Sequence, residues 1–161
     1  MAIKPAIKGI ITALLMIVVI LLSFHQVIPD KLSPENFVYI LYGAGIAWTL
    51  ISYNKQSDFT GKFKDNFAQG FKTFIVITLV MALFTFVFNY QHPEFAKESA
   101  QKFKTEMIQE NKKTPAEIET ATVEFEKQFP VMILSGSIFG YLIFGAVVTL
   151  VTSLFLTRRN K

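Results

Sequence analysis

Four long stretches of the sequence contain no Asp, Glu, Lys or Arg, and each is apolar for most of its length. They are Gly9–Pro29, Phe37–Asn54, Thr73–Pro93 and Gln128–Thr157, the shortest having 18 residues. A helix of 18 residues extends about 27 Å, close to the hydrocarbon core of a bilayer at about 30 Å. Four such runs in 161 residues predict an all-α membrane protein with a single integral membrane domain. The expected bundle of four transmembrane helices covers residues 9–29, 37–54, 73–92 and 131–156.

The composition agrees with this class and removes several kinds of chemistry. Hydrophobic residues make up 52% of the chain and charged residues only 17%, so the apolar content exceeds what an ordinary soluble core requires. There is no cysteine. Disulfides, thiol catalysis and cysteine-ligated zinc or iron–sulfur sites are therefore excluded.

The first apolar stretch also resembles the start of a secretory signal, since two lysines precede it. A cleavable signal ends in a small-x-small site. Here the stretch ends in "SFHQ", which places Phe24 and His25 where small residues would be needed. We therefore expect an uncleaved first membrane span, with removal of the segment as the alternative.

The basic residues are distributed unevenly between the predicted loops. The two termini and residues 55–72 together hold nine basic and two acidic residues, a net charge of +7. The remaining segments hold seven basic and ten acidic residues, a net charge of −3. Because lysine and arginine in short loops stay on the cytoplasmic side, both termini are expected to be cytoplasmic. The basic character reflects this asymmetry, and we expect no nucleic-acid partner.

A phenylalanine stripe precedes the third span, in "DFTGKFKDNFAQGFKTF". At 100° per residue its rings fall within an arc of about 120°, and Lys62 and Lys64 lie outside it. The pattern predicts an interfacial helix over residues 59–71, whose rings enter the acyl boundary while the lysines face anionic headgroups. Packing of the same face on the cytoplasmic ends of the bundle remains an equal alternative. The rings at the membrane interface are Phe59, Phe63, Phe67 and Phe71.

The loop between the third and fourth spans contains two helix signals. Pro93 precedes the first, and "TPAE" begins the second with Thr114 as N-cap, Pro115 at the first helical position and Glu117 at the third. These signals predict an extracytoplasmic amphipathic helical hairpin over residues 94–129. The apolar faces of the two helices contain Phe95, Phe103, Ile118 and Phe125.

Several motifs together resemble a known family. They are the glycine–aromatic element "GKFKDNFAQGFKTF", "PEF" directly after the third span, "TPAEIE" in the Lys/Glu-rich loop, a glycine-rich fourth span and a short basic tail. The chain resembles the bacterial membrane-protein family called domain of unknown function 4199. The resemblance covers essentially the whole chain and implies a bacterial inner-membrane protein. It implies no known activity, ligand or catalytic residue.

Catalytic and metal-binding motifs are missing from the sequence. No Asp, Glu, Lys or Arg lies inside the predicted spans, and there is no H-E-x-x-H, phosphate-binding glycine loop or G-x-S-x-G. We therefore expect no enzyme activity, no catalytic residue, no cofactor and no metal. His25 and His92 with Glu94 could form a two-histidine, one-carboxylate site. The alternative, which we favour, is that both histidines are interfacial residues at the ends of spans.

Small residues at helical spacing predict close helix packing. Gly136 and Gly140 form a G-x-x-x-G pair in the fourth span, and Gly145 lies about 180° round the helix from Gly136. In the second span, Gly43 and Ala47 have the same spacing. Packing within the bundle is the expected role, with self-association as the alternative.

These observations predict a non-enzymatic structural, interaction or lipid-contacting membrane protein. Its expected partners are the lipid bilayer and either another membrane protein or a second copy of the chain. The alternative is a small channel or transporter subunit that is active as an oligomer. In that case Thr78, Thr85 and Asn89 would line the shared path.

Overall fold

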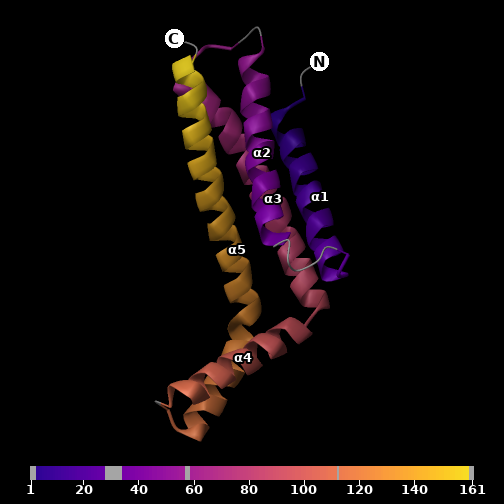
Figure 1. The fold of residues 1–161 in the computed structure, drawn as a ribbon, viewed down its shortest axis with the longest axis vertical. Coiled ribbons are helices and arrows are strands. Elements are labelled where there is room, and N and C mark those ends of the chain that lie inside the picture. The colour runs from indigo at the N-terminus through magenta and orange to yellow at the C-terminus, as the bar shows by residue number, and fades with distance from the viewer. Residues whose placement is uncertain (1–2, 28–33, 57–58, 112, 160–161) are drawn as a thin grey trace. The chain divides into compact units, whose positions relative to one another are not determined.

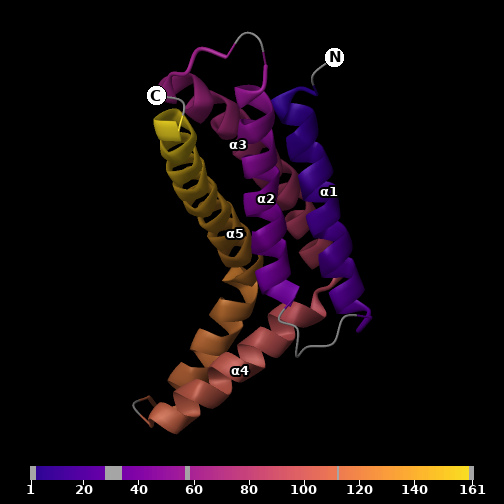
Figure 2. The ribbon, with the colours of Figure 1, turned by 45° about the horizontal axis from the view of Figure 1, so that its top comes forward.

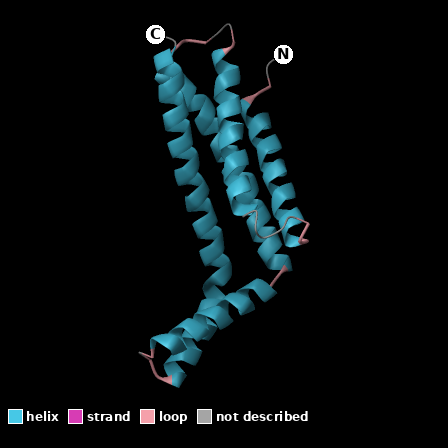
Figure 3. Ribbon diagram, in the orientation of Figure 1, coloured by secondary structure: helices cyan, strands magenta, loops and turns pink. Residues whose placement is uncertain are grey.

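A computed structural model describes the chain apart from residues 1–2, 28–33, 57–58, 112 and 160–161. All the regular elements of the described residues are α-helices, as Figure 3 shows. The helices are α1 (Pro5–Phe24), α2 (Pro34–Asn54), α3 (Phe63–Gln91), α4 (Glu94–Glu110) and α5 (Pro115–Arg159).

The chain forms two compact units. The first comprises residues 1–81 and 138–161, and the second comprises residues 82–137. In the first unit, α1 and α2 lie side by side (Figures 1 and 2). The initial part of α3 and the final part of α5 also pack there, because Gly70 meets Thr149 and Gly145 meets Phe74.

In α1, many large apolar side chains are exposed and most of the buried ones are small or polar, the reverse of a helix in a soluble protein. Pro5 begins it, where the missing N–H removes no hydrogen bond. Its large aliphatic side chains, including Ile7, Ile10 and Leu14, are exposed. Small and polar side chains form the face packed inside the unit, and this buried face consists of Lys8, Gly9, Thr12, Ala13 and Met16.

Three helices are long and apolar enough to cross a membrane, namely α1, α3 and α5. Helix α2 is not among them, although its 21 residues would extend about 31 Å. Tyrosines, glycines and a terminal asparagine lower its apolar content. The prediction of a fourth span over residues 37–54 therefore stays a prediction.

Helix α3 differs from the predicted arrangement of an interfacial helix followed by a separate span. It begins at Phe63 and continues without a break to Gln91. In the sequence, Gly70 near the junction of the two expected segments suggests a bend, but it is buried inside the helix, where an added Cβ would lie 3.0 Å from Thr149 Oγ1. Gly70 therefore makes room for a neighbouring helix. Phe59 precedes α3, and its ring meets that of Tyr53 edge-on at 5.5 Å.

Helix α5 also joins two segments that the sequence analysis treated separately. It extends over 45 residues and contains Pro130, which we placed at the boundary between the hairpin and the fourth span. A proline inside a helix removes one backbone hydrogen bond, but it does not have to end the helix. The hairpin's second helix and the predicted span are thus one continuous element.

In the second unit, α4 pairs with the first turns of α5. The rings of Phe103 and Phe125 stack at 4.5 Å with an interplanar angle of 11°, and Lys104 forms an ion pair with Glu119. Asn111 ends α4 in the left-handed conformation, with φ of 52°. The apolar contact between the two helices therefore uses two of the residues that the sequence analysis assigned to it.

A capping box begins α5. The Thr114 N–H donates to Glu117 Oε2 at 2.8 Å, and the Glu117 N–H donates to Thr114 Oγ1 at 3.4 Å. We expect Thr114→Ala to speed hydrogen exchange of the amides at positions 117 and 118 roughly fivefold, the factor typical of a lost cap. Thr114→Ser keeps the hydroxyl and should leave exchange unchanged. Equal exchange in both variants would contradict a capping role.

Candidate functional site

A small polar cavity lies in the first unit, where α1 begins, α2 ends and the first turns of α3 pass. Its volume is 170 Å³. We call it the cationic cavity, and its lining residues are Ile3, Lys4, Pro5, Lys8, Thr49, Tyr53, Gln56 and Gln69. The lining residues thus include two lysines, two glutamines, a tyrosine and a threonine, and the space is too small for a drug-sized ligand, which needs about 300 Å³ or more.

Lys8 is the most unusual residue of the cavity, because its side chain is only 4% exposed. Its Nζ lies 5.2 Å from the centroid of the Trp48 ring, a cation–π contact. Within the described residues, no carboxylate forms an ion pair with Lys8. A cation–π contact offsets only part of the cost of withdrawing an ammonium from water. Lys8 is therefore a buried cationic side chain without an acidic partner among the residues that the structure describes.

Close helix contacts hold Lys8 in this position. A Cβ added to Gly9 would lie 2.9 Å from the Thr73 carbonyl oxygen on α3. A Cβ added to Gly45 on α2 would lie 2.5 Å from Thr12 Cγ2, and the Thr12 hydroxyl donates to the Lys8 carbonyl at 2.9 Å. The first turns of α1 therefore cannot move away from α2 and α3 without losing this contact.

Hydroxyl groups connect the three helices next to the cavity. The Thr49 hydroxyl donates a hydrogen bond of 3.1 Å to the Gly45 carbonyl. It accepts a hydrogen bond of 3.1 Å from the Thr73 hydroxyl. The Thr73 hydroxyl also has the Pro5 carbonyl of α1 within 3.4 Å. These groups position the cavity wall, and none of them is activated by a neighbouring base.

A second polar cluster connects α2, α3 and α5. Asn66 is fully buried, and its Oδ1 accepts a hydrogen bond of 2.8 Å from Asn54 Nδ2. Its own Nδ2 donates to Thr157 Oγ1 at 3.3 Å. Asn54 Nδ2 also donates to the Leu50 carbonyl at 2.7 Å. Asn54, Asn66 and Thr157 have no titratable side chain, and these hydrogen bonds connect three helices.

The phenylalanine stripe is divided between exposed and buried positions. Successive rings along α3 are in contact, at 5.8 Å from Phe63 to Phe67, 6.5 Å from Phe67 to Phe71 and 5.1 Å from Phe71 to Phe74. Phe63 and Phe67 are half-buried, Phe71 is exposed and Phe74 is buried. Lys62 and Lys64 are both exposed.

The glycines singled out for packing have unequal surroundings. A Cβ at Gly145 would lie 2.7 Å from Phe74 Cβ and closer still to the Tyr42 hydroxyl. At Gly43 and Gly136 an added Cβ would meet nothing within 4 Å, and at Gly140 only the Tyr39 hydroxyl, at 4.0 Å. Ala47 is half-buried. The closest contacts are instead made by glycines that were not assigned to packing, namely Gly9, Gly45 and Gly70.

Several of the remaining candidate residues lie in the second unit. Within it, His92 Nδ1 is 2.7 Å from Glu94 Oε1, and this hydrogen bond holds the pKa of the Glu94 carboxyl below its ordinary value. No group of three His, Cys, Asp or Glu side chains suited to a metal occurs among the described residues. Asn89 Nδ2 donates to the Thr85 carbonyl of its own helix at 2.8 Å. Phe95 contacts Phe88 at 5.8 Å, and Ile118 is buried.

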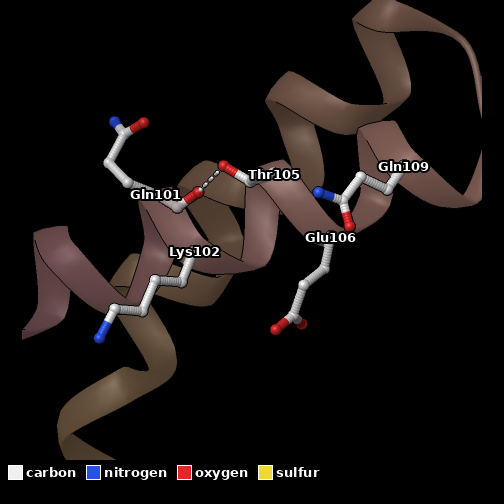
Figure 4. A pocket seen from close by; sticks show the side chains of 5 residues that line it. All are labelled: Gln101, Lys102, Thr105, Glu106 and Gln109. Carbon is white, nitrogen blue, oxygen red and sulfur yellow. Dashed lines mark hydrogen bonds between the residues drawn. The ribbon is translucent and has the colours of Figure 1, made fainter.

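A hollow on α4 differs from the cationic cavity in that all its lining residues are exposed. Figure 4 shows its side chains projecting from a single helix, with the Thr105 hydroxyl donating to the Gln101 carbonyl at 2.9 Å. Lys102 and Glu106 point away from the helix into open space (Figure 4). Since each of these side chains is exposed, the hollow is part of the solvated face of α4.

A comparison with protein families identifies the chain. The model of the family described as "Protein of unknown function (DUF4199)" matches residues 6–158. The chain belongs to the DUF4199 family. The resemblance inferred from the sequence motifs is thereby confirmed. The matched residues contain all five described helices of the DUF4199 chain except the first residue of α1 and the last residue of α5. No curated protein and no solved structure matches this DUF4199 chain.

From the sequence, Lys8 is one of the basic residues of the amino terminus that were expected only to set the topology. A signal for its burial was present, because Lys8 and Thr12 are four residues apart and Gly9 and Ala13 follow them on the same side of the helix. In a helix surrounded by lipid, small and polar residues mark the face that contacts other helices. That rule places Lys8 inside the DUF4199 fold.

Proposed function

We propose that this DUF4199 protein is a non-enzymatic integral membrane protein that contacts lipid and protein partners without chemical turnover. The supporting observation is the surface of its long apolar helices. Large aliphatic and aromatic side chains are exposed along α1, α3 and α5, for example Leu14, Leu79, Leu83, Ile143 and Phe155. Contiguous apolar surface of this kind requires lipid or a partner to cover it.

In the proposed topology, α1, α2, α3 and the later part of α5 form a four-helix bundle in the bacterial inner membrane. The asymmetry of charge favours cytoplasmic termini, with the pairing of α4 and the start of α5 outside the membrane. Helix α2 would be the fourth span because its inner face supplies Tyr42, Ile46 and Leu50, all fully buried, to the first unit.

The lack of cysteine permits a direct test of this topology, because each introduced cysteine is the only thiol. We expect a membrane-impermeant maleimide to label Gln109→Cys on intact spheroplasts and to label Lys64→Cys only after permeabilisation. Both positions are exposed, so access to reagent is matched. Leu83→Cys, on the apolar surface, should react in neither condition. Equal labelling of positions 64 and 109 on intact spheroplasts would contradict the topology.

A non-enzymatic role is supported by the chemistry of the cationic cavity. It contains donors and positive charge, but the lining residues that the structure describes include no carboxylate, histidine or thiol that could act as a base or nucleophile. Binding is therefore the role that its residues support best.

A further inference from the structure

We propose that the cationic cavity binds the phosphate group of an anionic phospholipid. This inference rests on the proposed function, since it assigns a site to the expected contact with lipid. The observation that carries it is the side chain of Lys8, which is 4% exposed and faces a cavity of 170 Å³ without a carboxylate partner among the described residues.

The donors around the cavity suit an anion with several oxygens. Lys4 and Lys8 provide positive charge, while Tyr53, Gln56 and Gln69 provide O–H and N–H groups. Hydrogen bonds from charged donors to phosphate oxygens are about twice as strong as neutral ones. A bound phosphate would pair with Lys8, for which the described part of the chain offers no carboxylate.

The position of the cavity favours a lipid headgroup as the source of the phosphate. The cavity lies at the first turn of α1, the end of α2 and the early turns of α3, which is one end of two long apolar helices. Ile3, which lines the cavity, is exposed, as are Ile7 and Ile10 in the first turns of α1, so apolar surface is available there for acyl chains. Basic pockets between membrane helices on the cytoplasmic side bind anionic lipid headgroups in this manner.

The test uses the full-length protein in a neutral detergent, with its melting temperature measured during titration. The additives are dioleoyl phosphatidylglycerol, dioleoyl phosphatidylcholine and inorganic phosphate. We expect phosphatidylglycerol to raise the melting temperature in a saturable manner and phosphatidylcholine to have little effect. Stabilisation by inorganic phosphate at similar concentrations would overturn the assignment to lipid and indicate free phosphate instead.

Lys8→Met tests the residue that carries the inference. This change should weaken the apparent affinity for phosphatidylglycerol about tenfold or more, the scale expected for one charge-assisted contact. Lys64→Met removes an exposed lysine from the same unit and is the matched control, with little change expected. Equal weakening in both variants would show general attraction of lipid to basic residues and would overturn the proposal.

A second measurement separates binding from a structural role of Lys8. If its charge is kept for a ligand, Lys8→Met should leave unchanged or raise the melting temperature without lipid, because a buried unpaired charge has been removed. If Lys8 only packs on Trp48, the variant should melt lower without lipid and keep its response to phosphatidylglycerol, which would overturn the proposal. The proposed membrane location is tested separately by washing membranes with carbonate. Release of the protein by this treatment would contradict that location.

Discussion

Replacement of Gly145 by leucine is expected to destabilise the protein in detergent more than any other substitution considered. Even a Cβ at this position would lie 2.7 Å from Phe74 Cβ and still nearer to the hydroxyl of the fully buried Tyr42. Overpacking at such a site costs about 3 kcal/mol, the upper part of the usual range. The measurement is thermal unfolding of the purified variant, followed by circular dichroism.

Gly136→Leu is the matched control, because it is a change of the same size in the same helix. An added Cβ there meets nothing within 4 Å, so the melting temperature should change little. Equal destabilisation of the two variants would contradict the packing described for Gly145. A change in oligomeric size in Gly136→Leu alone would instead support self-association through this surface.

The second large effect is expected for Asn66→Leu, which removes the side-chain link between α2, α3 and α5. Asn54 and Thr157 would each lose one hydrogen-bond partner in a buried cluster. Hydrogen bonds between membrane helices contribute about 0.6 kcal/mol on average and at most about 1.7, so a loss of about 1–2 kcal/mol is expected for the two. Unfolding in a titration with a denaturing detergent measures it.

Asn89→Leu controls for the removal of an asparagine amide as such. Asn89 donates a hydrogen bond to the Thr85 carbonyl in its own helix, so this variant should lose little stability. A double-mutant cycle then tests the link directly, since Asn66→Leu and Thr157→Val should be non-additive while Asn66→Leu and Asn89→Leu should add. Additive effects in both cycles would contradict a link through Thr157.

Hydrophobic patterning predicted the class of the fold, because a charge-free run of 18 or more residues has few alternatives to a long apolar helix. The boundaries were harder to predict. Gly70 and Pro130 are both residues that commonly interrupt helices, yet α3 and α5 continue through them. Whether a glycine is a bend or a contact depends on the neighbouring helix, here Thr149 of α5, which is distant in sequence.

The same limitation applies to the packing glycines and to the cationic cavity. The G-x-x-x-G spacing of Gly136 and Gly140 identifies residues that share a face, but it does not indicate which helix that face meets. Lys8 lies near the chain terminus, where lysines usually set topology, and its burial depends on Trp48 and Gln69 of other helices. Only the arrangement of three helices brings these groups together.

The hydrogen bond from Tyr42 has a consequence for biosynthesis. Its hydroxyl donates to the carbonyl of Tyr141 at 2.9 Å, and the two residues are 99 positions apart in the chain. At about 5–20 residues per second, the ribosome needs roughly 5–20 s to make the intervening segment. During that interval the Tyr141 carbonyl that accepts from this phenol has not yet been made, so a nascent chain that stalls before its last helix presents an incomplete interior to the cell's proteases.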